Sequence, residues 1–354
     1  MVEITREFLE SYLAERLGPL FVGELERFGR GISRETWFIE GRHPDGRVEK
    51  LVLRRDLDGN SIGTGPLRLE YEVYRRLKSS DVPVAEVLWW EDHSRWVPDG
   101  RPFYLRRHVE GTWDVPDYQN PDPAFDQLRI DVGREHIRKL ALVHGCDWRS
   151  LGFSDVLPTP ENEGDCARVA VDRMYADLAR FQFTPLPVIT EVREWLLDNA
   201  PRAARISLLK GTNGRGEEIF RDGVIVAMSD WEQASLGDPA CDFARSQEYL
   251  QDLVVDGRKV WGLEQALAYY EEVSGVGVER SSVEYYRVLT SVENTITLHH
   301  AAKPLAERAS PSVRLAWLAT EGVWGGQVRM MDAVSGRLRL ADPPRPASTF
   351  AQAI

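Results

Sequence analysis

A change of pattern near Gly111 constrains the fold of this chain more than any other feature of its sequence. From Glu24 to Gly111, short runs of β-branched and aromatic residues alternate with turn dipeptides, which is typical of an antiparallel sheet. One helical pattern, Pro66–Ser80, interrupts these runs. After Gly111 the apolar residues recur mostly at helical spacing. The sequence therefore predicts an α+β protein in which a small sheet-rich part precedes a larger helical part.

The individual elements can be placed by residue type. Strand patterns are "TWFIEG", "KLVLRRD", "VPVAEVLWWEDHS" and "RPFYLRRHVEG", and the helical patterns cover 1–18, 126–148, 189–200, 263–275 and 281–303. A hairpin interrupts the helical part from Ile219 to Asp230, because the dipeptide Asp222-Gly223 accepts the positive φ angles of a tight turn. We expect residues 341–354 to form a loosely held tail.

Composition excludes several classes of partner. The 354 residues correspond to two domains or lobes at roughly 150 residues each. A net charge of −12 and a pI near 5.2 argue against nucleic-acid or anionic-membrane partners, which require a basic surface. The first residues form a charged helical pattern and not a signal peptide, and no apolar stretch is long enough to cross a bilayer. Three cysteines without CxxC spacing, Cys146, Cys166 and Cys241, predict reduced thiols in a cytoplasmic protein.

Several segments carry a resemblance to a known family. "GDPACDFA" after "SDWEQASL" resembles the signature D-W-E-x-x-x-x-G-D-P-x-x-D-x-A of the aminoglycoside phosphotransferase and choline kinase superfamily. "FGRGISRETWFIE" resembles its nucleotide loop, and "LVLRRD", "LEYEVYRRL" and "LALVHGCDWRSLGF" resemble the branch related to the kinase-like domains of some acyl-CoA dehydrogenases. The match runs in consistent order from about Glu24 to about Ala302. It implies a two-lobed protein-kinase-like fold with lobes at 1–108 and 109–340, and ATP and Mg²⁺ as cofactors.

The resemblance also implies a nucleotide site between the lobes. Its residues would be Gly29, Gly31, Ser33, Thr36, Val52, Arg54, Glu70, Arg107 and Val109. The glycines let backbone approach phosphates, although "GRGISR" by itself equally fits a hairpin turn. Val52 would cap adenine, while Arg54 would hold phosphate oxygens and pair with Glu70, unless these two form a surface ion pair. Backbone groups from Arg107 to Val109 would bond adenine.

Asp230 is the strongest candidate for a metal ligand. It ends the apolar strand "VIVAMSD", so its carboxylate would emerge at the edge of the cleft, where a hard cation needs oxygen ligands. Asp238 and Asp242 are expected to brace the loop by hydrogen bonds. His144 and Asp147 in "VHGCDW" imitate part of a catalytic loop, but His144 is interpreted as a structural residue. His299 and His300 point to different faces of one helix and predict no shared metal site.

The expected catalytic loop departs from the family pattern H-G-D-x-H-x-G-N. Glu217 lies 13 residues before Asp230, at the position of the family's asparagine. Lys210 then replaces the first histidine and Thr212 the catalytic aspartate. A threonine cannot accept the substrate's proton as a carboxylate does, whereas Glu217 keeps an oxygen that can bind metal. The candidate catalytic residues are therefore Lys210, Thr212, Asn213, Glu217 and Glu218, with Glu218 as a possible substitute base.

Three functions fit these residues. The first is an ATP- and Mg²⁺-dependent transferase acting on a hydroxyl of a small molecule, which the related branch suggests is a hydroxylated acid or an acyl thioester. The second is a pseudokinase that binds nucleotide or another ligand without turnover. The third is different chemistry on the same scaffold, using the polar groups of the Lys210–Glu218 loop. The acceptor pocket is expected between Val115–Asp131 and the C-terminal helices.

Overall fold

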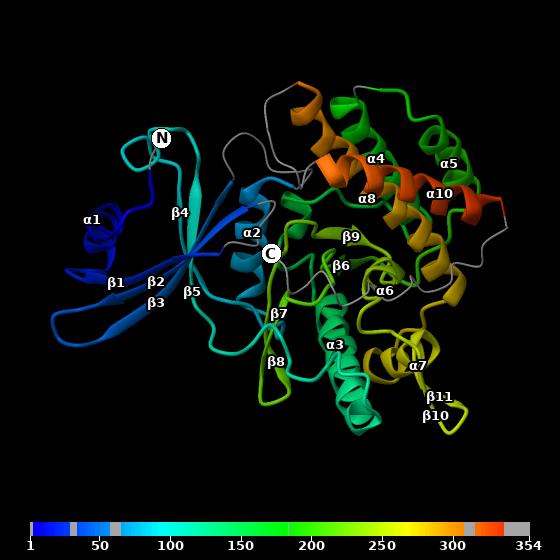
Figure 1. Cartoon of the computed structure of the whole chain (residues 1–354), viewed down its shortest axis with the longest axis horizontal. Coiled ribbons are helices and arrows are strands. Elements are labelled where there is room, and N and C mark those ends of the chain that lie inside the picture. The colour runs from blue at the N-terminus through cyan, green and yellow to red at the C-terminus, as the bar shows by residue number, and fades with distance from the viewer. Residues whose placement is uncertain (1–2, 29–33, 57–64, 183, 308–315, 336–354) are drawn as a thin grey trace.

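The front lobe is built on one five-stranded antiparallel sheet (Figure 1). The computed structural model of the chain describes residues 3–28, 34–56, 65–182, 184–307 and 316–335. The strands are β1 (Phe21–Arg27), β2 (Arg34–Arg42), β3 (Val48–Asp56), β4 (Val87–Glu91) and β5 (Phe103–Arg107), in the order β1-β2-β3-β5-β4. Helix α1 (Arg6–Leu17), capped by the Thr5 side chain, shares a core with one face of the sheet.

Side-chain alternation along β3 separates the two faces of this sheet. Leu51 and Leu53 belong to the core under α1, so Val52 and Arg54 project to the opposite face. Helix α2 (Leu67–Leu77) packs Val73 and other apolar residues into the core of the back lobe. A helix inserted between β3 and β4 of the front sheet therefore shares a core with the back lobe, which links the two lobes.

The back lobe is mainly helical. Its helices are α3 (Asp126–Gly145), α4 (Cys166–Phe181), α5 (Pro187–Asp198), α6 (Ala240–Arg245), α7 (Leu263–Ser274), α8 (Arg280–Ala306) and α10 (Val323–Val334), with short helical turns η1 (Pro123–Phe125), η2 (Phe153–Asp155) and η3 (Leu318–Gly322). Three antiparallel strand pairs complete it: β6 (Ser207–Leu209) with β9 (Ser235–Gly237), β7 (Glu218–Arg221) with β8 (Val224–Met228), and β10 (Leu253–Val255) with β11 (Arg258–Trp261). Its core includes the fully buried Trp231, Phe243 and Tyr270.

The β7–β8 hairpin lies where the linker from the front lobe enters the back lobe. Asp222 and Gly223 have φ angles of 52° and 78°, and Arg221 pairs with Val224 across this two-residue turn, as the sequence predicts. Thr112 of the linker forms a β-bridge with Phe220. The crossing is tight, because a Cβ at Gly111 would lie 2.5 Å from the Phe220 carbonyl oxygen. Glycine is therefore required at this crossing.

Each strand and helix expected from the sequence appears at its place, but the sequence reading missed several elements. Helix α4, the short β6–β9 pair, α10 and the β10–β11 hairpin were not anticipated. The hairpin had a detectable signal, since Asp256-Gly257 repeats the turn dipeptide and has φ angles of 50° and 73°. Tail residues 341–354 lie outside the described residues. Among the described helices, none combines the length and the apolar character that crossing a membrane requires.

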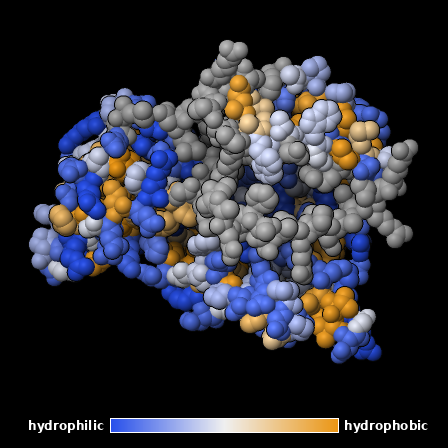
Figure 2. Space-filling view, viewed as in Figure 1, coloured by the Kyte–Doolittle hydropathy of each residue, from blue (hydrophilic) through white to orange (hydrophobic). Residues whose placement is uncertain are grey.

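Apolar side chains also reach the surface away from the junction of the lobes. In Figure 2 they gather at the lower right, over the β10–β11 hairpin, where Val254, Val255 and Val260 are exposed. The hairpin lies at the far end of the back lobe from the sheet (Figure 1). This patch is thus separate from the candidate site.

The anchoring of α2 can be tested with Leu77→Ala. Leu77 is fully buried in the back-lobe core, so the truncation should lower the free energy of unfolding by about 2–5 kcal/mol. Urea unfolding measures this difference. Leu142→Ala on α3, where the side chain is 36% exposed, is the matched control and should cost far less. Equal losses in the two variants would contradict the anchoring.

Candidate functional site

An arginine of the front sheet meets acidic groups from two other segments at the junction of the lobes. Arg54 Nη1 lies 2.8 Å from Glu70 Oε1 on α2, and Arg54 Nη2 lies 3.7 Å from Asp230 Oδ1, which follows β8. The Tyr104 hydroxyl donates to the same Glu70 oxygen at 2.9 Å. Burial lowers the pKa of Arg54, but Glu70 and its other neighbours outweigh this and raise the pKa well above the ordinary value. The guanidinium is thus permanently charged at this junction.

Asp230 has an unusual backbone conformation for a residue with a side chain. Its φ of 62° is left-handed, and a non-glycine residue keeps such a conformation where its surroundings enforce it. Trp231, which follows, is fully buried and donates its indole N–H to the Met228 carbonyl oxygen at 3.0 Å. The Asp230 side chain is 25% exposed, and its Oδ1 accepts no hydrogen bond from the described residues. The exposed part of this carboxylate is available to a hard cation.

Arg34 and Glu232 form a second charged contact across the junction. Arg34, at the start of β2, is buried, with Nε 3.9 Å from Glu232 Oε2. Its Nη1 pairs with Asp56 and its Nη2 donates to the Gly65 carbonyl oxygen. Burial and the nearby Asp230 raise the pKa of Glu232 to about 7. The sequence did not reveal these partners of Arg34.

A buried carboxylate organises the loop that follows β6. Asp242 of α6 accepts the N–H groups of Lys210 and Gly211 at 2.8 and 2.9 Å and the Asn213 amide at 2.8 Å. His144 Nε2 lies 3.0 Å from it. Burial alone would raise the pKa of Asp242, but His144 and the two backbone N–H groups lower it to about 2. The geometry agrees with the expected bracing role of Asp242 and the structural role of His144.

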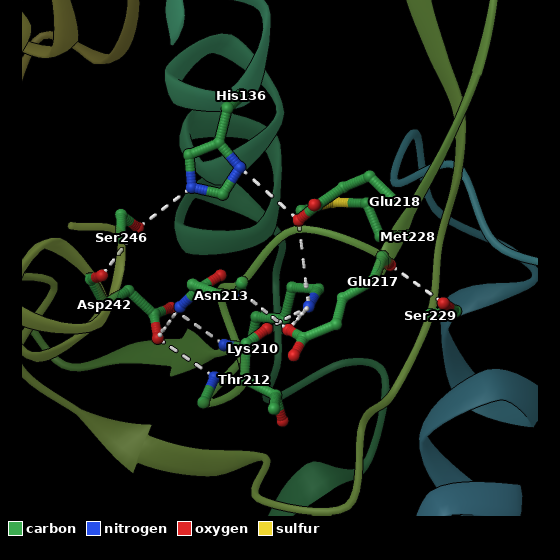
Figure 3. A network of polar contacts seen from close by, with 12 residues as sticks. His136, Lys210, Thr212, Asn213, Glu217, Glu218, Met228, Ser229, Asp242 and Ser246 are labelled. Atoms are coloured by element: carbon green, nitrogen blue, oxygen red, sulfur yellow. Dashed lines mark hydrogen bonds and ion pairs between the residues drawn. The ribbon is translucent and has the colours of Figure 1, made fainter. Parts of the chain in front are cut away.

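The Lys210 side chain is turned into the protein (Figure 3). It has no solvent exposure, and Nζ lies 3.4 Å from Glu217 Oε2 and 3.8 Å from Glu218 Oε1. Nζ also donates to the Thr212 carbonyl oxygen. Burial lowers the pKa of Lys210, but the two glutamates outweigh this and raise it. This position suits a lysine that neutralises carboxylates, and a fully buried ammonium is not placed to contact a phosphate.

The geometry of Glu218 disagrees with its expected role as a substitute base. Its carboxylate is fully buried, lies 3.4 Å from His136 Nδ1 and accepts a hydrogen bond from the Tyr249 hydroxyl. Figure 3 shows it turned toward His136 on α3. Asn213 is also buried and used by Asp242. Neither side chain is positioned to receive a proton from a substrate, because the alternation along β7 and the α6 carboxylate direct them inward.

Glu217 and Thr212 differ from these buried groups. The Glu217 side chain is 20% exposed, and its Oε2 accepts the Gly214 N–H at 2.8 Å. Burial raises the pKa of Glu217 to about 7 against the opposing effect of Lys210. Thr212 is half-buried, and its hydroxyl has no hydrogen-bond partner among the described residues. The position of the family's catalytic aspartate therefore carries an uncommitted hydroxyl.

The other expected nucleotide residues are only partly placed. Gly29, Gly31 and Ser33 lie outside the described residues, while Thr36 is half-buried and pairs with Arg54 in the β2–β3 register. Val52 is fully buried on the Arg54 face of β3. The Arg107 N–H donates to the Glu86 carbonyl oxygen at 2.8 Å, so this N–H is not open to adenine, and the expected backbone bonds to adenine stay a prediction. Val109 is half-buried and packs against the back-lobe core.

No cluster of the described residues forms a metal site without help from a ligand. Three or more histidine, cysteine, aspartate or glutamate side chains with suitable spacing are not found among them. A Mg²⁺ ion usually keeps one or two carboxylates and takes its remaining ligands from water and substrate phosphates. The partly exposed carboxylate of Asp230 fits such a partial site.

Asp238 gives the back lobe a predicted pH dependence. Its Oδ1 accepts the Ala240 N–H at 3.0 Å, and burial raises its pKa to about 6. The folded protein thus binds this proton more tightly than the unfolded chain, so the stabilisation is complete below about pH 4 and is lost as the pH rises through about 6. The loss amounts to about 3 kcal/mol. Unfolding of Asp238→Asn and the unmodified chain between pH 4 and 7.5 measures it, and a difference independent of pH would refute the assignment.

Comparison with known proteins agrees with this geometry. The model of a family described as the phosphotransferase enzyme family matches residues 24–275. The chain is 27% identical over 250 residues to acyl-CoA dehydrogenase family member 10 of Mus musculus, a match that covers 69% of the chain and 22% of that protein. The chain thus spans less than a third of the length of this relative.

Solved structures share the fold. A candidate aminoglycoside phosphotransferase from Ralstonia eutropha superposes with a TM-score of 0.67 at 19% identity, covering 94% of this chain and 98% of that one. An aminoglycoside phosphotransferase solved with streptomycin and ATP has a TM-score of 0.58 at 17% identity, covering 94% and 99%. The expected two-lobed kinase-like fold is confirmed. Because the family model matches most of its length, the chain belongs to the phosphotransferase enzyme family.

Proposed function

We propose that this chain binds ATP and a divalent cation between its lobes and transfers the γ-phosphoryl group to a hydroxyl of a small molecule. The observation that carries the proposal is the contact of Arg54 with both Glu70 and Asp230. It brings a phosphate-binding cation and a metal-binding carboxylate together from opposite lobes. Phosphoryl transfer depends mainly on positioning and charge stabilisation, which these groups can supply.

Asp230 would hold the cation through its partly exposed carboxylate. When bound, the cation bridges phosphate oxygens and neutralises charge that develops during transfer. Arg54 presents a fork of N–H donors that suits phosphate oxygens, and Glu70 with Tyr104 fixes the orientation of that fork. Val52, on the same face of β3, would lie under the adenine ring. The Arg54 side chain is 11% exposed, and a phosphate would contact this exposed part.

Loss of the family's aspartate is expected to slow the chemistry. Thr212 offers a hydroxyl where a carboxylate would orient the acceptor, and general-base loss costs about 10²- to 10⁴-fold in rate. The relative named as an acyl-CoA dehydrogenase family member favours a hydroxy acid or hydroxyacyl thioester as the acceptor. Residues 115–131 and the C-terminal helices remain our proposed acceptor region.

A second candidate function is nucleotide binding without transfer. Thr212 favours it, because Glu218, the expected substitute base, is fully buried. The third possibility, a new polar site made by the loop, has less support. Lys210, Asn213 and Glu218 are all buried and engaged with other protein groups.

Nucleotide binding can be tested by thermal unfolding with the non-hydrolysable analogue AMP-PNP and Mg²⁺. At a ligand concentration 100 times the dissociation constant, we expect stabilisation of about 2.7 kcal/mol. Asp230→Asn should lose the part that depends on Mg²⁺. Asp177→Asn, which changes an exposed aspartate on α4, should retain it. Absence of stabilisation in the unmodified chain would refute the proposal.

Transfer can be tested with the double substitution Thr212→Asp/Glu217→Asn, which restores the family residues. We expect turnover of ATP with hydroxy acids and hydroxyacyl thioesters to increase by about 10²- to 10⁴-fold, since a carboxylate returns to the acceptor. A coupled ADP-release assay with an acceptor panel measures it. If the substitution abolishes a measurable activity, the native loop has a chemistry of its own. If both proteins bind nucleotide and neither turns over, the second candidate function is favoured.

A further inference from the structure

We infer that the Lys210 ammonium takes the place of one of the two cations of a kinase-like site, so that this chain binds nucleotide with a single divalent cation at Asp230. The inference rests on the proposed nucleotide binding. Kinases commonly hold two metal ions, one on an aspartate that follows a strand and one on the asparagine of the catalytic loop. In this chain Asp230 and Glu217 stand at those two positions.

The Lys210 ammonium group is surrounded by oxygen atoms of the loop. Nζ of Lys210 lies 3.4 Å from Glu217 Oε2 and 3.8 Å from Glu218 Oε1, and it donates to the Thr212 carbonyl oxygen. Two carboxylates and a carbonyl are the oxygen ligands that a metal ion would otherwise collect. The lysine is fully buried, so its positive charge is a fixed part of the loop.

The Glu217 carboxylate is already bound by other groups of the protein. Its Oε2 accepts the Gly214 N–H at 2.8 Å in addition to its contact with Lys210. A divalent cation bound to this carboxylate would lie beside the ammonium in a site that is largely shielded from water. Like charges repel strongly in such surroundings. A second metal ion is therefore disfavoured at Glu217, whereas the Asp230 carboxylate is 25% exposed, accepts no hydrogen bond through Oδ1 from the described residues and lies farther, 3.7 Å, from Arg54 Nη2.

The Lys210 side chain is held at this position by the buried carboxylate of Glu218. Glu218 is held by the Tyr249 hydroxyl and by His136, whose ring stacks on Tyr249 with centroids 4.0 Å apart. His136 Nε2 lies 2.9 Å from Ser246 Oγ, which donates to the Asp242 carbonyl oxygen (Figure 3). Withdrawal of the ammonium would leave a fully buried carboxylate without its cation, which is strongly unfavourable.

Lys210 and Glu217, two of the departures in the loop, have opposite charges. Lys210 adds a positive charge at the position of the family's histidine, and Glu217 adds a negative charge at the position of its asparagine. Their side chains are in contact in the folded protein. The charges of Lys210 and Glu217 therefore offset each other, and the cation of the pair is supplied by the chain itself.

The number of bound cations tests this inference directly. Electron paramagnetic resonance counts the Mn²⁺ ions bound per AMP-PNP complex, and isothermal titration measures AMP-PNP binding separately. We expect one Mn²⁺ for the unmodified chain. We expect two for Lys210→Met/Glu218→Gln, which removes the ammonium together with its buried partner and leaves Glu217 unpaired. The control, Lys139→Met/Glu135→Gln, changes another lysine–glutamate pair 3.4 Å apart on α3 and should keep one.

A second variant keeps the inference testable if the double substitution impairs folding. Glu217→Gln retains the Lys210–Glu218 contact and should still bind one Mn²⁺, because Glu217 is not the ligand. Two Mn²⁺ ions in the unmodified chain, or loss of the single ion in Glu217→Gln, would overturn the inference. If AMP-PNP does not bind the unmodified chain at all, the proposed function fails and this inference fails with it. Binding of AMP-PNP with two Mn²⁺ ions overturns this inference alone.

Discussion

The guanidinium of Arg54 lies between carboxylates that come from different parts of the chain, with Glu70 at 2.8 Å and Asp230 at 3.7 Å. A buried charge of this kind is tolerated where partners surround it, and removing one partner typically costs about 3–5 kcal/mol. The front sheet, α2 and the end of β8 must therefore keep their mutual positions for the charge to remain paired. The same requirement aligns the groups that a nucleotide would contact.

The loop after β6 shows how a catalytic segment can become part of the protein's framework. Its backbone keeps the family's glycine at 211, where φ is 86° and a Cβ would lie 2.3 Å from the Gln233 carbonyl oxygen. Its side chains have changed roles. Lys210 and Asn213 now satisfy buried carboxylates, so much of the loop's polar chemistry stabilises the fold. Of the candidate catalytic residues, Thr212 and Glu217 are the two that are only partly buried.

The sequence was informative about the site wherever a role depends on the local pattern. Asp230 ends an apolar strand, and Arg54 lies two residues beyond Val52 on the same face of its strand. Both positions therefore follow from local periodicity. The pairing of Arg54 with Glu70 was likewise predicted and formed. The engaged N–H of Arg107 and the pairing of Glu218 with His136 were not predictable, because each depends on a partner far away in sequence. His136 had no signal of its own within its helical pattern.

The sequence alone determined the change from sheet to helices and the altered identity of the catalytic loop. These properties are local, since periodicity, turn dipeptides and residue types within a short window decide them. The tertiary structure decided which charges meet. Lys210 could have faced a phosphate or a carboxylate, and packing against α3 and α6 selected the carboxylates. Contacts between residues far apart in sequence require the whole fold, because each partner is placed by a different element.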